Sequence, residues 1–122
     1  MRGFGELEAA IMDRLWSRGE PATVREILVD LRPERELAYN TVLTVIDNLF
    51  KKGWLRRARD GRAHRFVPTA SREEHGARLM RDALDESGDP RQALVQFVGQ
   101  MSSNEAAALR AALAAHEESA AR

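Results

Sequence analysis

The sequence predicts a mainly α-helical fold with one small β-hairpin, and two features of the chain carry this prediction. Apolar side chains recur at three- and four-residue spacing before residue 53 and after residue 71, as they do on helices with one buried face. Between these segments, an arginine-rich stretch is divided by Asp60-Gly61, a dipeptide that favours a tight hairpin turn of type I′. We therefore expect helices on both sides of a two-stranded hairpin.

Two short helices are expected before residue 39, each with one apolar stripe facing a common core. The first spans residues 6–18 and stops at Gly19. The second opens at the capping box Thr23-Val-Arg-Glu26, in which the threonine hydroxyl and the glutamate carboxylate each bond a free backbone amide. It ends at Arg32, because a residue that precedes proline is disfavoured in the helical region.

The third helix, residues 39–52, is the element around which the chain is organised. Its inward stripe consists of Val42, Val45, Ile46 and Leu49. Small polar side chains lie near its N-terminus, two lysines lie at its C-terminus, and Gly53 suits the left-handed position after a helix end. This arrangement suits a helix laid in the major groove of DNA. By itself, however, the segment favours an ordinary amphipathic surface helix.

The next segment predicts a β-hairpin with strands at residues 54–59 and 62–67. An isolated hairpin is only marginally stable, so we expect it to pack on the helices, with Trp54, Leu55 and Phe66 in the core. Two short helices, a longer helix and a hairpin follow one another in the order of a winged helix-turn-helix.

The hairpin carries a local excess of positive charge, although the whole chain has a net charge of +0. Between residues 51 and 65 the anion is Asp60, whereas the cations are Lys51, Lys52, Arg56, Arg57, Arg59, Arg62 and Arg65. A patch of this density can bind phosphates on an otherwise neutral chain. The plain alternative is that these cations only form a solvated surface. The excess of cations over anions favours phosphate binding, and it therefore favours a DNA-binding role for the third helix.

The chain from residue 71 onward predicts three further helices. Capping boxes at Ser71–Glu74 and Ser102–Glu105 open two of them, Pro90 suits the first turn of the helix between them, and the last helix is expected to end at about residue 115. Their large apolar side chains are too many for so small a core, so we expect a second copy of the chain to cover them in a symmetric dimer. The expected dimerisation residues are Leu79, Leu84, Leu94, Phe97, Val98, Met101, Leu109 and Leu113. We therefore expect a winged-helix DNA-binding domain at 1–70 and a helical dimerisation region at 71–122.

The sequence also excludes several classes of protein. It has no cysteine, which excludes disulfides, thiolate metal sites and thiol-based sensing and fits a cytoplasmic protein. It has no apolar run long enough to span a membrane, so no direct membrane binding is expected. It holds no glycine-rich phosphate loop and no nucleophile beside a base, so we expect neither an enzyme nor a cofactor. His75 and His116 lack metal-ligand spacing and are expected to lie exposed on helices.

Three segments resemble the BlaI/MecI penicillinase-repressor family: Leu37-Ala-Tyr-Asn-Thr-Val-Leu-Thr-Val-Ile-Asp47, Lys51-Lys-Gly-Trp-Leu55 and Arg59-Asp-Gly-Arg-Ala-His-Arg-Phe66. The likeness extends into the first helix and the C-terminal helices, so it covers nearly the whole chain. It implies a homodimeric repressor that binds a palindromic operator in double-stranded DNA, with the third helix in the major groove and the hairpin, or wing, on the backbone.

The resemblance also implies which residues contact DNA. Contacts to bases or to the groove fall on Tyr39, Asn40, Thr41, Leu43 and Thr44, and Leu43 suits a thymine methyl. Contacts to phosphates fall on Lys51, Lys52, Arg57, Arg59, Arg62, His64 and Arg65. Proteins of this family are typically inactivated when a membrane-bound, β-lactam-sensing metalloprotease triggers cleavage in the dimerisation region, which corresponds here to Gln96-Phe97. A related branch senses copper through a cysteine cluster that this chain lacks.

Two other functions stay open on the residues alone. A winged-helix protein–protein module would place the third helix against a partner protein, but it would not need several arginines together on its hairpin. A ligand-gated repressor of another family would need a buried pocket, for which the short C-terminal helices leave little room.

Overall fold

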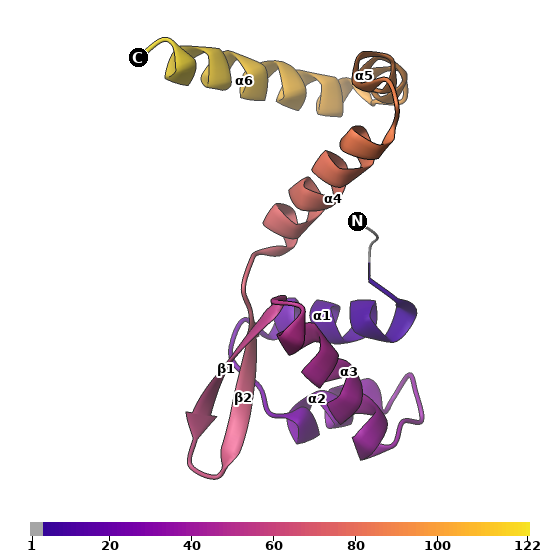
Figure 1. Cartoon of the computed structure of the whole chain (residues 1–122), viewed down its shortest axis with the longest axis vertical. Helices are drawn as coiled ribbons and strands as arrows, with labels where there is room; N and C mark the ends of the chain where they lie inside the picture. The colour runs from indigo at the N-terminus through magenta and orange to yellow at the C-terminus, as the bar shows by residue number, and fades with distance from the viewer. Residues whose placement is uncertain (1–3) are drawn as a thin grey trace. The chain divides into compact units, whose positions relative to one another are not determined.

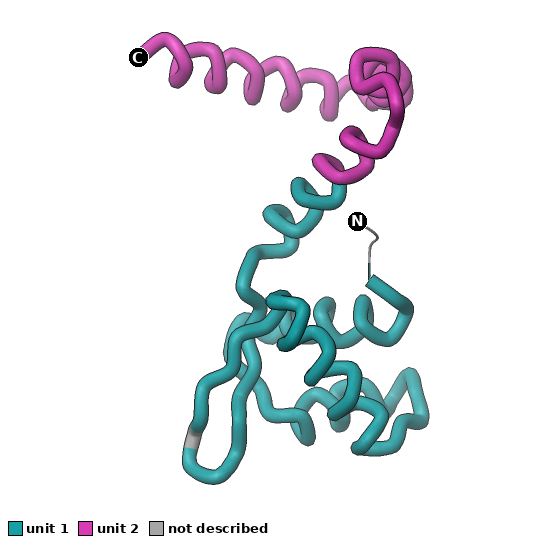
Figure 2. Tube along the Cα trace, in the orientation of Figure 1, with its two compact units in different colours: residues 1–79 teal, residues 80–122 magenta. Residues whose placement is uncertain are grey.

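The computed structural model describes residues 4–122, apart from the side chain of Asp60, and it contains two compact units, Met1–Leu79 and Met80–Arg122 (Figure 2). The elements in chain order are α1 Glu6–Arg18, α2 Val24–Leu31, α3 Tyr39–Lys51, β1 Leu55–Asp60, β2 Ala63–Pro68, α4 Arg72–Glu86, α5 Pro90–Gly99 and α6 Ser103–Ala120 (Figure 1). The predicted mainly α-helical fold with one hairpin is confirmed. The first residues of α4 belong to the first unit and the remaining ones to the second.

The first unit is built around a core shared by three helices and the hairpin. α1, α2 and α3 pack on one another, β1 packs on α3, and β2 packs on α1 and α2 (Figure 1). The inward stripe of α3 is buried as predicted, since Val42, Ile46 and Leu49 are all fully inaccessible and Val45 is half-buried. Burying each side chain of this size stabilises the fold by about 1.5–3 kcal/mol, so this stripe fixes α3 against the other helices.

The hairpin turn lies one residue further along the chain than predicted. The strands pair from Leu55 opposite Pro68 to Asp60 opposite Ala63, so the turn residues are Gly61 and Arg62. Gly61 has a φ of 64°, and among the described residues positive φ occurs only at glycine, so the type I′ turn at Asp60-Gly61 was wrong. Glycine at the first central position is the pattern of a type II′ turn. This register keeps Leu55 and Phe66 on the same, buried face of the hairpin, because a shift of two residues does not change which face a side chain occupies.

The link between α1 and α2 pairs with the hairpin. Ala22 donates its backbone N–H to the Phe66 carbonyl at 3.1 Å, and the Phe66 N–H returns a bond to the Ala22 carbonyl at 2.8 Å. The wing is therefore hydrogen-bonded to the segment that leads into α2.

The start of α4 packs on the rest of the first unit through an aromatic cluster of Phe4, Trp16, Trp54 and His75. The His75 ring stacks on Phe4 with 4.3 Å between centroids and meets the edge of Trp54 at 4.7 Å. The indole Nε1–H of Trp16 donates to the Ala70 carbonyl at 3.0 Å, just before α4 begins. His75 is only 7% exposed, so the prediction of an exposed His75 was wrong. Helical spacing alone did not reveal that aromatic side chains from other elements surround this turn of α4.

The second unit lacks a core of its own. Among the residues that the structure describes, none in α5 or α6 is buried. The Ser102–Glu105 capping box is present, with Glu105 N–H to Ser102 Oγ at 3.1 Å. α6 continues to Ala120, past its predicted end, because alanine has the highest helix propensity. No helix in the described part of the chain is long and apolar enough to cross a membrane.

Candidate nucleic-acid interface

The outward face of α3 carries the residues that the sequence predicts at DNA bases. Tyr39 and Leu43 are 41% and 40% exposed, although both are large hydrophobic side chains. Asn40, Thr41 and Thr44 are also exposed. The Thr44 hydroxyl donates to the Asn40 backbone carbonyl at 2.9 Å, which fixes the rotamer of Thr44 and leaves its methyl group and oxygen lone pairs for an external contact.

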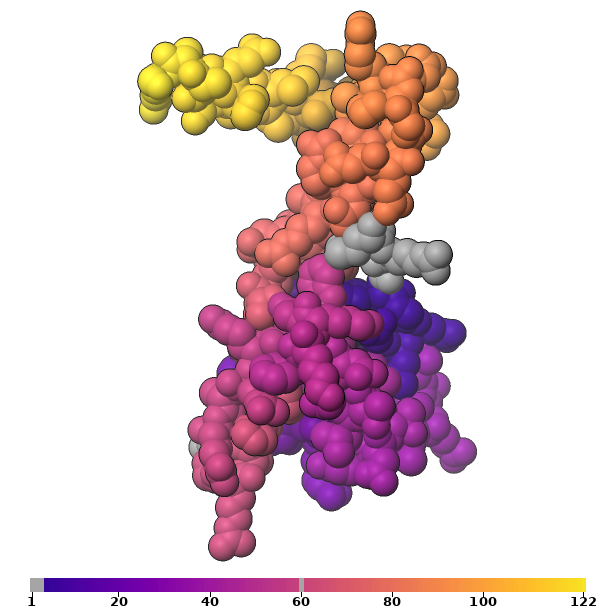
Figure 3. All heavy atoms as spheres, viewed as in Figure 1, coloured from indigo at the N-terminus to yellow at the C-terminus, as the bar shows by residue number. Residues whose placement is uncertain are grey.

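A groove with a volume of about 440 Å³ lies between α3, the start of α2 and the wing. It is lined by Thr23, Val24, Arg25, Tyr39, Leu43, Asp47, Arg57, Arg62, Ala63, His64 and Phe66. Predicted base contacts from α3 and predicted phosphate contacts from the wing thus share one concave surface. The hairpin reaches past the helices of its own unit (Figures 1 and 3). This surface can hold an elongated polyanion between a helix and a cationic arm.

Sequence reasoning missed Arg25 as part of this surface. Its guanidinium carbon lies 5.5 Å from the centre of the Tyr39 ring, a cation–π arrangement that joins α2 to α3. The residues are fourteen positions apart, so no local pattern links them. Asn40, Thr41 and Thr44 do not line the groove, and they occupy the remaining exposed surface of the first turns of α3.

The two lysines at the end of α3 have carboxylate partners within the chain. Lys51 Nζ lies 2.9 Å from Asp47 one turn earlier, and Lys52 Nζ lies 3.0 Å from Glu8 of α1. The pKa of Glu8 is lowered, chiefly by the Gly5 backbone N–H that donates to it and further by Lys52. The lysine side chains are 70% and 57% exposed, and pairs this exposed contribute about 0–1 kcal/mol. Replacing such a carboxylate partner with a DNA phosphate therefore costs little free energy.

The wing cations divide between the two faces of the hairpin. Cross-strand partners share a face, and the register pairs Arg57 with Phe66 and Arg59 with His64. The guanidinium of Arg57 lies over the Phe50 ring at 4.3 Å, and Arg59 Nε donates to the Gly61 carbonyl at 3.2 Å. This face is the one that lines the groove.

Arg65 lies on the other face of the hairpin. It is paired with Ala58 across the strands, and it does not line the groove. Its Nη1 lies 2.7 Å from Glu26 Oε1 of α2. The structure therefore separates Arg65 from the other cations with which the sequence had grouped it.

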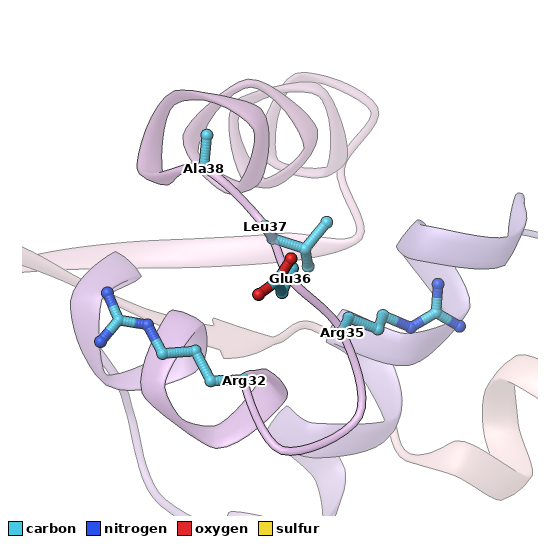
Figure 4. A pocket seen from close by; sticks show the side chains of 5 residues that line it. All are labelled: Arg32, Arg35, Glu36, Leu37 and Ala38. Atoms are coloured by element: carbon cyan, nitrogen blue, oxygen red, sulfur yellow. The ribbon is translucent and has the colours of Figure 1, made fainter.

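A second hollow, of about 560 Å³, lies at the loop between α2 and α3. It is lined by Arg32, Arg35, Glu36, Leu37 and Ala38. Figure 4 shows the guanidinium groups of Arg32 and Arg35 pointing away from each other, and Arg35 pairs with Glu6 of α1 at 3.2 Å. The polar groups do not converge, so this hollow is not built for a ligand. The described residues also contain no cluster of histidine and carboxylate side chains that could hold a metal ion.

Comparisons with known proteins agree with this architecture. Among solved structures, the monomeric form of Bacillus licheniformis BlaI in complex with the blaP half-operator has a TM-score of 0.51, with 20% identity, over 60% of this chain and 88% of that one. A DNA-binding domain of the repressor BlaI gives a TM-score of 0.52 with 21% identity, covering 61% of this chain and 93% of its own. Identities this low show the fold alone, which is a winged helix.

The sequence comparisons reach further than the fold. The transcriptional regulator BlaI of Mycobacterium tuberculosis is 50% identical over 114 residues, which are 91% of this chain and 83% of that protein. This relative is a regulator of transcription and not an enzyme. The model of the penicillinase repressor family matches residues 4–115. The resemblance that the sequence motifs indicated is thus confirmed, and the chain belongs to the penicillinase repressor family.

Proposed function

We propose that this chain is a transcriptional repressor of the BlaI type that binds a palindromic operator in double-stranded DNA as a homodimer. The observation that carries the proposal is the groove in which the exposed side of α3 and the cationic face of the wing meet. The regulator that is 50% identical and the BlaI structure bound to a half-operator support it. The chain has no need of a cofactor for this function.

Base and groove contacts in this proposal come from α3. They are assigned to Tyr39, Asn40, Thr41, Leu43 and Thr44, and their position on the first turns matches how such helices meet base edges. The exposed Leu43 offers an apolar contact to a thymine methyl. Phosphate contacts are assigned to Lys51, Lys52, Arg57, Arg59, Arg62 and His64. Arg65, which the sequence had grouped with them, is left out because it does not line the groove and pairs with Glu26.

The homodimer is proposed from the apolar surface of the second unit. The side chains of Leu94, Phe97, Val98 and Leu113 are each 45–52% exposed, and a monomer would leave them all in water. The full set of proposed dimerisation residues is Leu79, Leu84, Leu94, Phe97, Val98, Met101, Leu109 and Leu113. A symmetric partner would bury these surfaces and set the spacing of the two half-sites. In this view residues 1–70 bind DNA and residues 71–122 dimerise.

Release from the operator is proposed to occur by proteolysis between Gln96 and Phe97, triggered by a membrane-bound sensor metalloprotease. This peptide bond lies within α5, so the helix must open locally before a protease can reach the backbone. Cutting there would divide the proposed dimer surface and weaken the dimer. Antibiotic resistance is the process that such a repressor would control.

The proposal is tested by fluorescence anisotropy on DNA from the region upstream of the protein's own gene, against a scrambled duplex of equal length. We expect saturable binding that prefers the native duplex and weakens steeply with salt, because each phosphate contact releases counterions. Weak binding to both duplexes at physiological salt would favour a protein-interaction module instead.

A further inference from the structure

We propose that Arg65 positions the wing against α2 through Glu26, and that it does not contact phosphate as the groove-facing wing cations do. This inference rests on the proposed DNA-binding function, but it concerns how the wing is held and can be tested separately. Its first support is geometric. Arg65 Nη1 lies 2.7 Å from Glu26 Oε1, and the Arg65 side chain is 35% exposed.

Glu26 joins three elements of the first unit. Its Oε1 accepts the Thr23 backbone N–H at 2.9 Å, and its own N–H donates to Thr23 Oγ1 at 3.1 Å, which completes the capping box of α2. Its Oε2 accepts Arg18 Nη2 of α1 at 3.2 Å, and Arg18 Nη1 also reaches Asp30 at 2.9 Å. The carboxylate that receives Arg65 is therefore already fixed by α1 and α2.

The charge state of Glu26 suits this role. Its pKa is lowered, first by the Thr23 backbone N–H and further by Arg65 and Arg18, so the carboxylate stays ionised at neutral pH. Arg65 is less exposed than Lys51 and Lys52, and its partner Glu26 is held in place by Arg18 and Thr23, so a DNA phosphate does not readily replace this carboxylate. Counterion release on DNA binding should then owe little to Arg65.

The backbone next to Arg65 is also fixed. Phe66, the following residue, makes both hydrogen bonds of the bridge to Ala22 and is 6% exposed. Successive strand residues point to opposite faces, so Phe66 lines the groove while Arg65 faces away from it. The bridge thus attaches the edge of β2 to the segment before α2, and the Arg65–Glu26 pair attaches one face of β2 to α2 itself. This attachment sets the angle at which Arg62 and His64 face α3.

The decisive experiment compares Arg65→Ala with Arg62→Ala in operator binding over a range of salt concentrations. We expect Arg62→Ala to flatten the slope of log K against log salt by about 0.9 per protomer, as the loss of one phosphate contact does. Arg65→Ala should instead lower the affinity by about two- to fivefold at every salt concentration, the range that a partly exposed ion pair supports, with the slope unchanged.

Glu26→Gln is the matched variant, because glutamine retains the hydrogen bonds of the capping box and removes the charge. We expect it to lower the affinity as Arg65→Ala does, and we expect the double variant to be no weaker than either single one. A slope that flattens in Arg65→Ala as much as in Arg62→Ala, together with unchanged or tighter binding by Glu26→Gln, would overturn the inference.

Amide hydrogen exchange provides a second test of the positioning role of Arg65, and it needs no DNA. In Arg65→Ala and in Glu26→Gln the amides of Ala22 and Phe66 should exchange several-fold faster, whereas in Arg62→Ala they should not. Unchanged exchange in both variants would also refute the positioning role. Failure of the unmodified protein to prefer its operator would count against the proposed function alone.

Discussion

Acidification should destabilise the first unit through a single buried side chain, His75. Its ring is enclosed by Phe4, Trp16 and Trp54, with centroid distances of 4.3, 5.6 and 4.7 Å. Its Nδ1 is buried without a hydrogen-bond partner among the described residues. The pKa of His75 is lowered from its ordinary value of 6.5, chiefly by desolvation and further by the nearby charge of Arg78.

The sign of the effect follows from proton binding. The unfolded chain protonates this histidine below its ordinary pKa of 6.5, whereas the folded chain resists protonation until a lower pH. The unfolded state then binds more protons, so stability is fully present above that value and falls as the pH drops toward the folded pKa. Within this window the free energy of unfolding falls by at most about 1.4 kcal/mol per pH unit.

Two variants separate the ring contacts from the titration. His75→Ala removes the ring from three aromatic neighbours, and we expect a loss of about 2–4 kcal/mol at neutral pH. His75→Phe keeps a ring of similar shape and cannot be protonated. Its stability should therefore change less than that of the unmodified protein between about pH 7.5 and about pH 5.5.

The assay is urea unfolding followed by tryptophan fluorescence, since both tryptophans of the chain lie in the aromatic cluster. The pKa values of Glu8 and Glu26 are lowered from 4.5, so these carboxylates act below this window. If the unmodified protein and His75→Phe lose the same free energy over the window, the assignment to His75 is refuted.

Three further predictions address the core, the operator and the dimer. Ile46 is fully inaccessible in α3, so Ile46→Ala should lower the free energy of unfolding by about 2–5 kcal/mol, as measured by urea denaturation. A loss below about 1 kcal/mol would contradict the place of Ile46 in the core. Asn40→Ala should relax discrimination between operator and scrambled DNA by roughly 1–3 kcal/mol with the salt slope retained, and equal weakening on both duplexes would argue against a base contact. Phe97→Asp should convert a dimer to a monomer in sedimentation equilibrium, because it places a charge in the proposed apolar interface, and an unchanged mass would exclude Phe97 from that interface.

The sequence by itself determined the local features of this protein. The spacing of the apolar stripe of α3, the three capping boxes and the helix ends at Gly19 and Gly53 depend on residues at most four positions apart. Such contacts repeat with the period of the helix, so they leave a pattern along the chain. The same patterns, with the motif at 37–66, were specific enough to indicate the family.

Only the tertiary structure decided how these elements are joined. The bridge from Ala22 to Phe66 and the pair of Glu26 with Arg65 connect residues about forty positions apart, and no periodicity encodes them. The burial of His75 depends on aromatic rings from other elements. The pairing of Leu55–Asp60 with Ala63–Pro68 placed the hairpin turn at Gly61-Arg62, which the local preference of Asp60-Gly61 did not predict. Burying one large apolar side chain contributes about 1.5–3 kcal/mol, so contacts between residues far apart in the sequence hold the elements together without leaving a local pattern.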